Sequence, residues 1–336
     1  MGRLDKLYNI THMKTVWQKL PRPFFVLAPM ENVTDTVFRR IVLQCGRPDV
    51  FFTEFTNVDG LISKGHDHVV HRLQYTETER PIIAQIWGNN PQHYYDAVKI
   101  VKDLKFDGVD INMGCPVNKV VTKGFCAGLI RNPQLAKEIV LATKEAAGDM
   151  PVSVKTRIGY NNIQTEEWIG FLLELKPAAI TVHARTAAEM SKVPAHWEEI
   201  GKAVALRNSM KSETVIIGNG DVKSRQDGME KYEQYKMDGV MIGRGVFDNV
   251  WIFNKDIDPQ SISHQQKIQT LIEHIELFHQ VWGEKKNPEI MKKFYKVYVS
   301  GMPDAAEFRA ALMQCKGAQE TIKLLKEKIN KKIISV

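Results

Sequence analysis

One stretch of the chain reads Gly108-Val109-Asp110-Ile111-Asn112-Met113-Gly114-Cys115-Pro116. Its first residues have the apolar character of a buried strand, and the proline ends that strand because it cannot continue the hydrogen bonds of a sheet. Cys115 therefore follows directly on a strand end. Cysteine is often simply packed in a core, so the meaning of this thiol depends on the segments around it.

Seven further short apolar runs, each bounded by turn residues, also predict strands. With the run above, the eight predicted strands are 24–27, 50–53, 82–86, 109–111, 152–155, 180–182, 215–217 and 240–242. Helical patterns follow most of them, at 35–45, 91–104, 133–147, 165–175, 195–207 and 224–237. A strand-then-helix unit repeated eight times is typical of a (β/α)8 TIM barrel, which has about 250 residues. We therefore predict an α/β barrel over residues 1–250.

The pattern changes at residue 251. Apolar residues then recur at helical spacing in four segments that glycine and proline separate, at 268–282, 290–298, 308–315 and 322–329. We predict a C-terminal all-helical bundle domain over residues 251–336. This part holds 14 Lys and Arg against 10 Asp and Glu, and so carries +4 of the total net charge of +7. Such an excess suits a polyanionic partner, although a lysine-rich helix is as often only a solvated face.

Cys45, Cys115, Cys126 and Cys315 lie far apart and form no Cys-x-x-Cys pair. This spacing argues against a disulfide framework and against a structural zinc site, so we expect no metal. The N-terminus lacks the apolar core of a signal peptide, and no run approaches the roughly 20 apolar residues of a membrane span. We expect a soluble cytoplasmic protein that acts as a monomer and has no membrane partner.

Polar side chains stand where the predicted strands end. They are Met30 and Glu31, Glu54, Gln85, Asn112 and Cys115, Lys155 and Arg157, His183 and Arg185, Asn219 and Asp221, and Gly243 with Arg244. In a TIM barrel the C-terminal ends of the strands form the active-site face. We therefore take these residues as candidates for chemistry.

Two glycine turns follow the last two predicted strands, Gly218-Asn219-Gly220-Asp221 and Gly243-Arg244-Gly245. Loops at these places usually hold a phosphate in this fold, because glycine lets backbone N–H groups approach the oxygens and arginine adds a bidentate partner. We predict a phosphate-bearing cofactor here. Lys155 and His183 would then lie beside a planar ring, where a cation stabilises an anionic reduced flavin. The Gln85 amide could donate and accept at the ring edge.

Seven motifs, taken in order, resemble those of the tRNA-dihydrouridine synthases. They are Ala28-Pro29-Met30-Glu31-Asn32-Val33-Thr34-Asp35, Gln85-Ile86-Trp87-Gly88-Asn89, Asn112-Met113-Gly114-Cys115-Pro116, Val154-Lys155-Thr156-Arg157-Ile158-Gly159, Val182-His183-Ala184-Arg185-Thr186, Gly218-Asn219-Gly220-Asp221 and Met241-Ile242-Gly243-Arg244-Gly245. The stretch 298–309 extends the resemblance into the helical part, especially to the bacterial B-type branch. The resemblance implies FMN on the C-terminal face of the barrel, NADPH as reductant, and reduction of the C5–C6 double bond of a D-loop uridine in tRNA.

The same resemblance implies roles for single residues. FMN would be held by Pro29, Met30, Gln85, Lys155, His183, Asn219, Gly220, Asp221, Gly243 and Arg244. Cys115 would be the general acid that protonates C5 of the uracil, and at a reference pKa near 8.5 its thiol would be largely neutral at pH 7. Asn112 and Arg185 would contact the uracil edge and an adjacent phosphate. The tRNA backbone would be gripped by Lys292, Lys293, Lys296 and Arg309.

Three positions depart from the family pattern. Asn32 and Ala184 each stand where glycine is common, and we expect Asn32 to keep the turn because asparagine tolerates a left-handed backbone. Cys126 stands where small residues are typical; we expect a structural role, with a substitute acid as the alternative. The segment Ala187-Ala188-Glu189, which follows Ala184, lacks the family's usual basic residue, so we expect the tRNA-facing loop to bind differently.

Two other functions remain open from the sequence. An FMN-dependent barrel acting on a free pyrimidine, similar to dihydroorotate dehydrogenase, would share the barrel but would need no basic helical domain. A non-catalytic tRNA-binding protein would keep the fold without needing Cys115, Lys155 and His183 together.

Overall fold

The computed structural model describes residues 15–258 and 261–333, and it contains a nearly closed barrel of eight parallel strands. The strands are β1 (Phe24–Leu27), β2 (Phe51–Phe52), β4 (Ile82–Trp87), β5 (Gly108–Met113), β6 (Val152–Arg157), β7 (Ala179–His183), β8 (Val215–Asn219) and β9 (Gly239–Ile242). Their order is β1-β9-β8-β7-β6-β5-β4-β2, and a bridge between Val26 and Val50 joins the two ends. The predicted TIM barrel is therefore confirmed.

The strands lie in a barrel because their side chains are apolar on both faces. Phe24, Phe52 and Met241 belong to the cluster that fills the barrel interior. Trp17, from α1 (Val16–Lys19), packs on Phe24 and Phe52 with ring centroids 6.0 and 6.1 Å away. Because Phe24 begins β1, this tryptophan closes the N-terminal end of the barrel and leaves the opposite end for polar groups.

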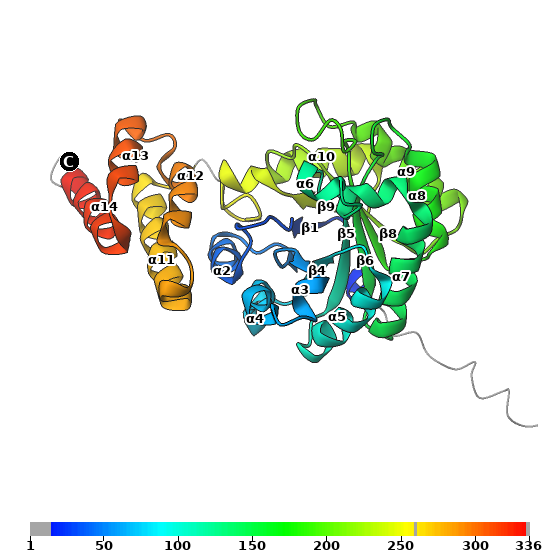
Figure 1. The fold of residues 1–336 in the computed structure, drawn as a ribbon. Helices are drawn as coiled ribbons and strands as arrows, with labels where there is room; N and C mark the ends of the chain where they lie inside the picture. Colours follow the sequence, from blue (N-terminus) through cyan, green and yellow to red (C-terminus); the bar gives the residue numbers. More distant parts are fainter. Residues whose placement is uncertain (1–14, 259–260, 334–336) are drawn as a thin grey trace, which may run out of the picture.

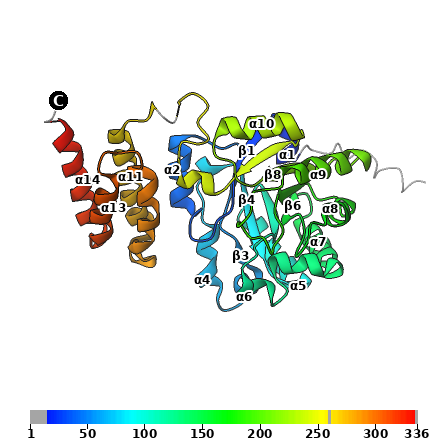
Figure 2. The ribbon, with the colours of Figure 1, turned by 90° about the horizontal axis from the view of Figure 1, so that it is seen from above.

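Six helices surround the barrel (Figure 1 and Figure 2). They are α2 (Thr36–Cys45), α5 (Pro91–Asp103), α7 (Pro133–Ala147), α8 (Thr165–Glu174), α9 (Trp197–Ser209) and α10 (Arg225–Tyr235). All six were predicted, since capping residues mark several of their starts: Asp35, Asn132 and Ser224 each accept a hydrogen bond from a backbone N–H of the first turn.

Short elements in the loops were not predicted, because a segment of two to six residues shows no periodicity. They are β3 (Thr56–Asn57), α3 (Val58–Leu61), α4 (His66–Val69), α6 (Asn118–Val121), η1 (Val70–Leu73), η2 (Glu77–Glu79), η3 (Cys126–Arg131) and η4 (Arg244–Phe247). The turn at Asn32 has φ +55°, which confirms the expected left-handed backbone there.

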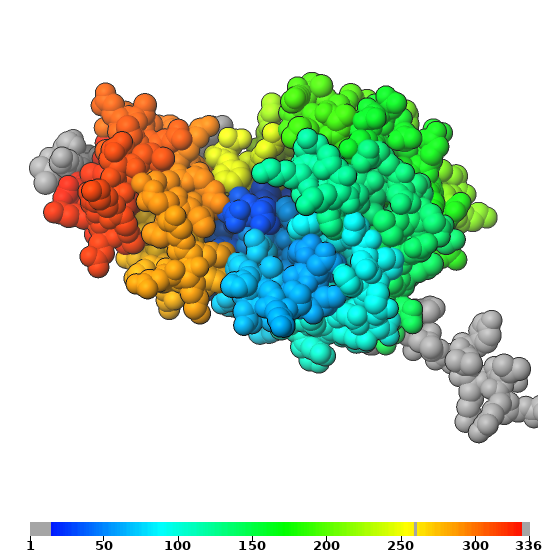
Figure 3. All heavy atoms as spheres, viewed as in Figure 1, coloured from blue at the N-terminus to red at the C-terminus, as the bar shows by residue number. Residues whose placement is uncertain are grey.

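The C-terminal part is all helical, as predicted. It consists of α11 (His264–Trp282), η6 (Gly283–Lys285), η7 (Pro288–Phe294), α12 (Tyr295–Val299), α13 (Ala305–Gln314) and α14 (Gly317–Ile333). In the space-filling view the orange segments lie beside the blue segment that contains α2 and the yellow segment after β9, and the red segments lie on their far side (Figure 3).

Aromatic rings and one charged cluster join the helical part to the barrel. Phe294 stacks on Phe38 of α2 at a centroid distance of 4.9 Å. Asp35 accepts hydrogen bonds from Trp282 Nε1 at 2.8 Å and from Lys286 Nζ at 3.0 Å. The contact surface thus combines stacked aromatic rings with hydrogen bonds to the Asp35 carboxylate. It lies next to the loop that follows β1.

The connection between the two parts packs closely on the barrel. Trp251, Ile252 and Phe253 are buried. A Cβ on Gly46 would lie only 2.4 Å from the backbone nitrogen of Asn254, so the connection lies against a residue that must be glycine. The division at residue 250 stays a prediction.

Candidate active site

Cys115 lies in a tight turn at the C-terminal end of β5. The Asn112 side-chain oxygen accepts hydrogen bonds from the backbone N–H groups of Gly114 and Cys115, both at 3.0 Å. The Asn112 amide nitrogen donates to Gln85 Oε1 at 3.0 Å. Asn112 therefore shapes the turn that carries the thiol, and one amide proton is left for a ligand.

A buried carboxylate sets the orientation of this network. Asp110 accepts hydrogen bonds from Gln85 Nε2 and from Ser153 Oγ, each at 2.7 Å. Complete burial raises the pKa of Asp110 to about 6, and these two hydrogen bonds oppose the rise. Because the carboxylate accepts, the Gln85 amide must turn its nitrogen toward Asp110 and its oxygen toward Asn112. Sequence reasoning missed Asp110, although a charge inside an apolar strand was a signal.

Lys155 and Asn219 face each other across the barrel end. Lys155 Nζ donates to Asn219 Oδ1 at 3.3 Å, and Asn219 Nδ2 donates to the Met241 carbonyl at 2.8 Å. Burial lowers the pKa of Lys155 to about 8, so the ammonium is still mostly charged at neutral pH. Two of its three protons remain for a ligand.

His183 is a neutral ring in this site. Burial lowers the pKa of His183 well below its usual range, and nearby cations add to the effect. Arg185 Nη1 lies 3.2 Å from His183 Nε2. Since arginine can only donate, Nε2 accepts and Nδ1 carries the proton. His183 therefore offers one N–H donor.

These side chains line a cavity of about 630 Å³ at the C-terminal ends of the strands. It is lined by Ala28, Pro29, Met30, Lys155, His183, Arg185, Ser191, Asn219, Gly220, Asp221, Val222, Lys223, Met241, Gly243, Arg244, Gly245, Phe247 and Asp248. The structure thus brings the predicted cofactor residues together, except Gln85, which lies deeper in the barrel. Arg185, predicted to meet the substrate, also lines this cavity.

Four cationic side chains and two carboxylates line the cavity: Lys155, Arg185, Lys223 and Arg244, with Asp221 and Asp248. Asp221 accepts from Arg185 Nη2, from Arg244 Nη2 at 3.1 Å and from the backbone N–H of Ala195 at 3.1 Å. Gly220 has φ +139°, and a Cβ there would lie 2.8 Å from the Ala195 Cβ, so only glycine fits. The four lining cations outnumber the two carboxylates, and the cavity suits an anionic group.

Arg157 holds two loops of the site together. Its Nε donates to the Gly114 carbonyl at 2.7 Å, and its Nη1 donates to the carbonyls of Thr186 and Met190, both at 2.9 Å. Arg157 is 5% exposed. It therefore places a buried positive charge directly under the turn that carries Cys115.

Cys115 has an acidic thiol, contrary to the neutral thiol predicted for pH 7. The pKa of Cys115 is lowered to about 6, chiefly by a hydrogen bond from Cys126. Burial opposes this shift, while the Val117 N–H and the charges of Arg157 and Lys155 assist it. The reference value failed here because it contains none of these partners.

The thiol acidity can be measured by alkylation. We expect the rate at which iodoacetamide alkylates Cys115 to rise with pH through a midpoint near 6, because only the thiolate reacts. Cys126→Ala should move this midpoint upward, since it removes the main hydrogen bond. Cys315, whose pKa is raised by burial, serves as the internal control and should react only at higher pH. A Cys115 midpoint near the reference value of about 8.5 would contradict the assignment.

The four basic residues predicted to grip tRNA lie in the helical part and have different surroundings; they are Lys292, Lys293, Lys296 and Arg309. Lys292 pairs with Glu289 at 2.7 Å. Lys293 donates to the Asn32 carbonyl, so it bridges the helical part and the barrel. The other two are exposed. Their contact with RNA stays a prediction.

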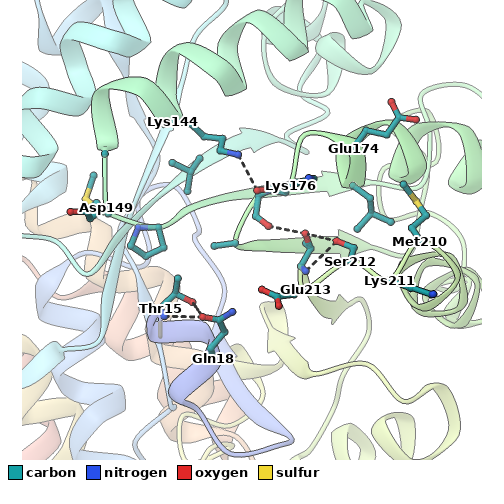
Figure 4. Close-up of a pocket in the computed structure, with 18 residues that line it drawn as sticks. Thr15, Gln18, Lys144, Asp149, Glu174, Lys176, Met210, Lys211, Ser212 and Glu213 are labelled. Carbon is teal, nitrogen blue, oxygen red and sulfur yellow. Dashed lines mark hydrogen bonds between the residues drawn. The ribbon is translucent and has the colours of Figure 1, made fainter. Parts of the chain in front are cut away.

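A second cavity lies at the opposite end of the barrel (Figure 4). It has a volume of about 840 Å³ and includes residues just before β6, β7 and β8. Lys144 donates there to the carbonyls of Leu175 and Lys176 at 2.9 and 3.1 Å. The cavity is remote from Cys115. Over residues 15–258 and 261–333, no cluster of side chains could hold a metal ion, and no helix is long and apolar enough to cross a membrane.

Known proteins are similar to this chain over nearly its whole length. A family model described as dihydrouridine synthase matches residues 26–334. The probable tRNA-dihydrouridine synthase 2 of Bacillus subtilis (strain 168) is 45% identical over 312 residues, which are 92% of this chain and 95% of the relative. The probable tRNA-dihydrouridine synthase of Staphylococcus aureus (strain COL) is 43% identical over 314 residues, 93% of this chain and 94% of the relative.

Among solved structures, histamine dehydrogenase from Rhizobium sp. 4-9 matches with a TM-score of 0.51 at 14% identity. The match covers 75% of this chain and 48% of that chain. At this identity the likeness concerns the fold alone.

Proposed function

This chain belongs to the dihydrouridine synthase family, and we propose that it reduces the C5–C6 double bond of a D-loop uridine in tRNA, with FMN as cofactor and NADPH as reductant. The observation that carries the proposal is the place of the Cys115 thiol: it follows β5 directly, and Asn112 of β5 pairs in parallel register with Lys155 of β6. A proton donor and a cation-lined cavity thus lie side by side at one end of the barrel.

The residues around the cavity fit FMN. Gly220, Gly243 and Arg244 suit the phosphate, because the glycines keep side chains away and the arginine can donate two hydrogen bonds. Lys155 has protons to spare for the electron-rich edge of the ring, and His183 offers its Nδ1 proton. Bound FMN, once reduced by NADPH, would supply the hydride for C6 of the uracil.

The chain's own residues supply the proton that C5 of the uracil receives. In its protonated form Cys115 would deliver a proton to C5 of the uracil, and Asn112 holds the turn that carries the thiol in place. The remaining amide proton of Asn112 is free to donate to the uracil edge. Asp110 keeps Gln85 and Asn112 in one orientation, so the turn needs no rearrangement when the base enters.

The target base must leave its stack to reach a cavity at the end of a barrel. We therefore propose that residues 251–336 are a tRNA-binding domain and that residues 1–250 are the catalytic domain. Lys296 and Arg309 are exposed on the helical part and are free to meet phosphates. We also propose that the enzyme is a monomer and acts in the cytoplasm.

Nucleoside mass spectrometry tests the function. Unmodified tRNA transcript, incubated with the purified protein, FMN and NADPH, is expected to gain dihydrouridine. Flavin released from the same preparation by denaturation is expected to be FMN, and replacing NADPH by NADH should slow the reaction. Reduction of a free pyrimidine without any change in tRNA would instead favour the dihydroorotate dehydrogenase-like function. A protein that binds tRNA and holds no flavin would favour the non-catalytic one.

A further inference from the structure

Cys126 lies directly against the proposed proton donor. The two thiols lie near enough to shift each other's pKa, with that of Cys115 lowered and that of Cys126 raised. The backbones are also joined, because Ala127 N–H donates to the Cys115 carbonyl at 3.3 Å. The two cysteines are free thiols in this structure. Ten residues of intervening chain thus fold back and bring the two cysteines next to each other.

The backbone conformation and the packing of its loop fix the position of Cys126. Its backbone has φ +50°, a left-handed conformation that cysteine rarely adopts. Gly128 N–H donates to the Phe125 carbonyl at 2.8 Å, and a Cβ on Gly128 would lie 2.8 Å from the Val121 carbonyl oxygen. Close packing of the loop therefore holds Cys126 in a strained conformation that turns its thiol to Cys115.

The two thiols differ in a way that suits sequential oxidation. Cys115 is half-buried and can meet small solutes, whereas Cys126 is 1% exposed. Arg157 and Lys155 place positive charge near Cys115, and burial raises the pKa of Cys126. Cys115 is therefore the nucleophile and Cys126 the neighbour that can resolve an oxidised sulfur.

We propose that Cys115 and Cys126 form a reactive dithiol that hydroperoxides oxidise to an intramolecular disulfide. The Cys115 thiolate attacks one peroxide oxygen, the O–O bond breaks, and hydroxide leaves and takes up a proton to form water. Cys126 then attacks the sulfenic sulfur of Cys115, and a second water leaves as the S–S bond forms. The two thiols lose two electrons, and the peroxide gains them. The consequence for activity rests on the proposed function, because the disulfide removes the proton donor for C5.

Peptide mapping tests the disulfide without any use of tRNA. The holoprotein is treated with hydrogen peroxide, unfolded in guanidinium chloride with N-ethylmaleimide present to block every free thiol, and digested with trypsin, which cuts after Lys119 and Lys123 and so separates the two cysteines. We expect peptides 106–119 and 124–131 to be joined and lighter by two hydrogens, while Cys45 and Cys315 carry the maleimide. In Cys126→Ala, Cys115 should instead be trapped by dimedone as a sulfenic acid. Oxidation of Cys115 to sulfinic acid beside an unreacted Cys126 would overturn the proposal.

An activity measurement completes the test, with each protein compared with its own reduced form. Peroxide should abolish tRNA reduction by the wild-type protein, and dithiothreitol should restore it. The Cys126→Ala variant should lose activity without full recovery, because its sulfenic acid is exposed to further oxidation. If the wild-type protein recovers no better than this variant, the protective disulfide is refuted. A disulfide that forms in a protein inactive on tRNA would support the dithiol and overturn the proposed function alone.

Discussion

Replacement of Cys115 by alanine is expected to slow dihydrouridine formation by about 10² to 10⁴-fold, which is the usual contribution of a general acid. FMN content and NADPH oxidation should stay close to those of the wild-type protein, because Cys115 does not line the cavity that suits the cofactor. The backbone of the turn should persist, since Asn112 holds it through the N–H groups of residues 114 and 115. The measurement is single-turnover dihydrouridine formation from enzyme reduced in advance.

The pH dependence adds a second readout to the same variant. A general acid must carry its proton, so the wild-type rate should fall as pH rises through the Cys115 pKa, about 6 in the free protein. This decline should be absent in Cys115→Ala. Cys315→Ala, at a buried thiol in the helical part, is the matched control and should keep both the rate and the profile. An alanine variant as fast as the wild type would disprove the assignment of the acid.

The sequence predicted the barrel and much of the site because parallel strands bring their C-terminal ends to one edge. Lys155 and His183 were therefore expected at the same end of the barrel, and both line the cavity there. The roles of Asp110, Arg157 and Cys126 could not be predicted in the same way. Their partners are set by packing between strands and loops: Arg157 reaches the Gly114 carbonyl 43 residues away. The thiol acidity of Cys115 was mispredicted for the same reason.

A buried ion pair outside the cavity supports the loop that carries Met30. Arg39 and Glu79 have fully buried side chains, and Arg39 Nε donates to Glu79 Oε2 at 2.5 Å. Arg39 Nη1 also donates to the Thr34 carbonyl at 2.6 Å, and Thr34 Oγ1 accepts from the Met30 N–H at 2.9 Å. The pair thus joins α2, η2 and the loop after β1. Each charge is bonded, so removing either one leaves the other buried without compensation.

Arg39→Met is accordingly expected to lower the free energy of unfolding by about 3–5 kcal/mol, the usual cost of breaking a buried ion pair from one side. Urea unfolding, monitored by tryptophan fluorescence, measures this decrease in the free energy of unfolding from the unfolding transition of the barrel. The double variant Arg39→Met/Glu79→Gln should recover part of it, because no buried charge remains. Glu233→Gln is the matched control: its pair with Lys236 is 64% exposed on both sides, so the change should stay below about 1 kcal/mol. A double variant no more stable than Arg39→Met would contradict this explanation. The stability lost in Arg39→Met would then come from the missing hydrogen bonds of Arg39, and the unpaired charge of Glu79 would contribute nothing.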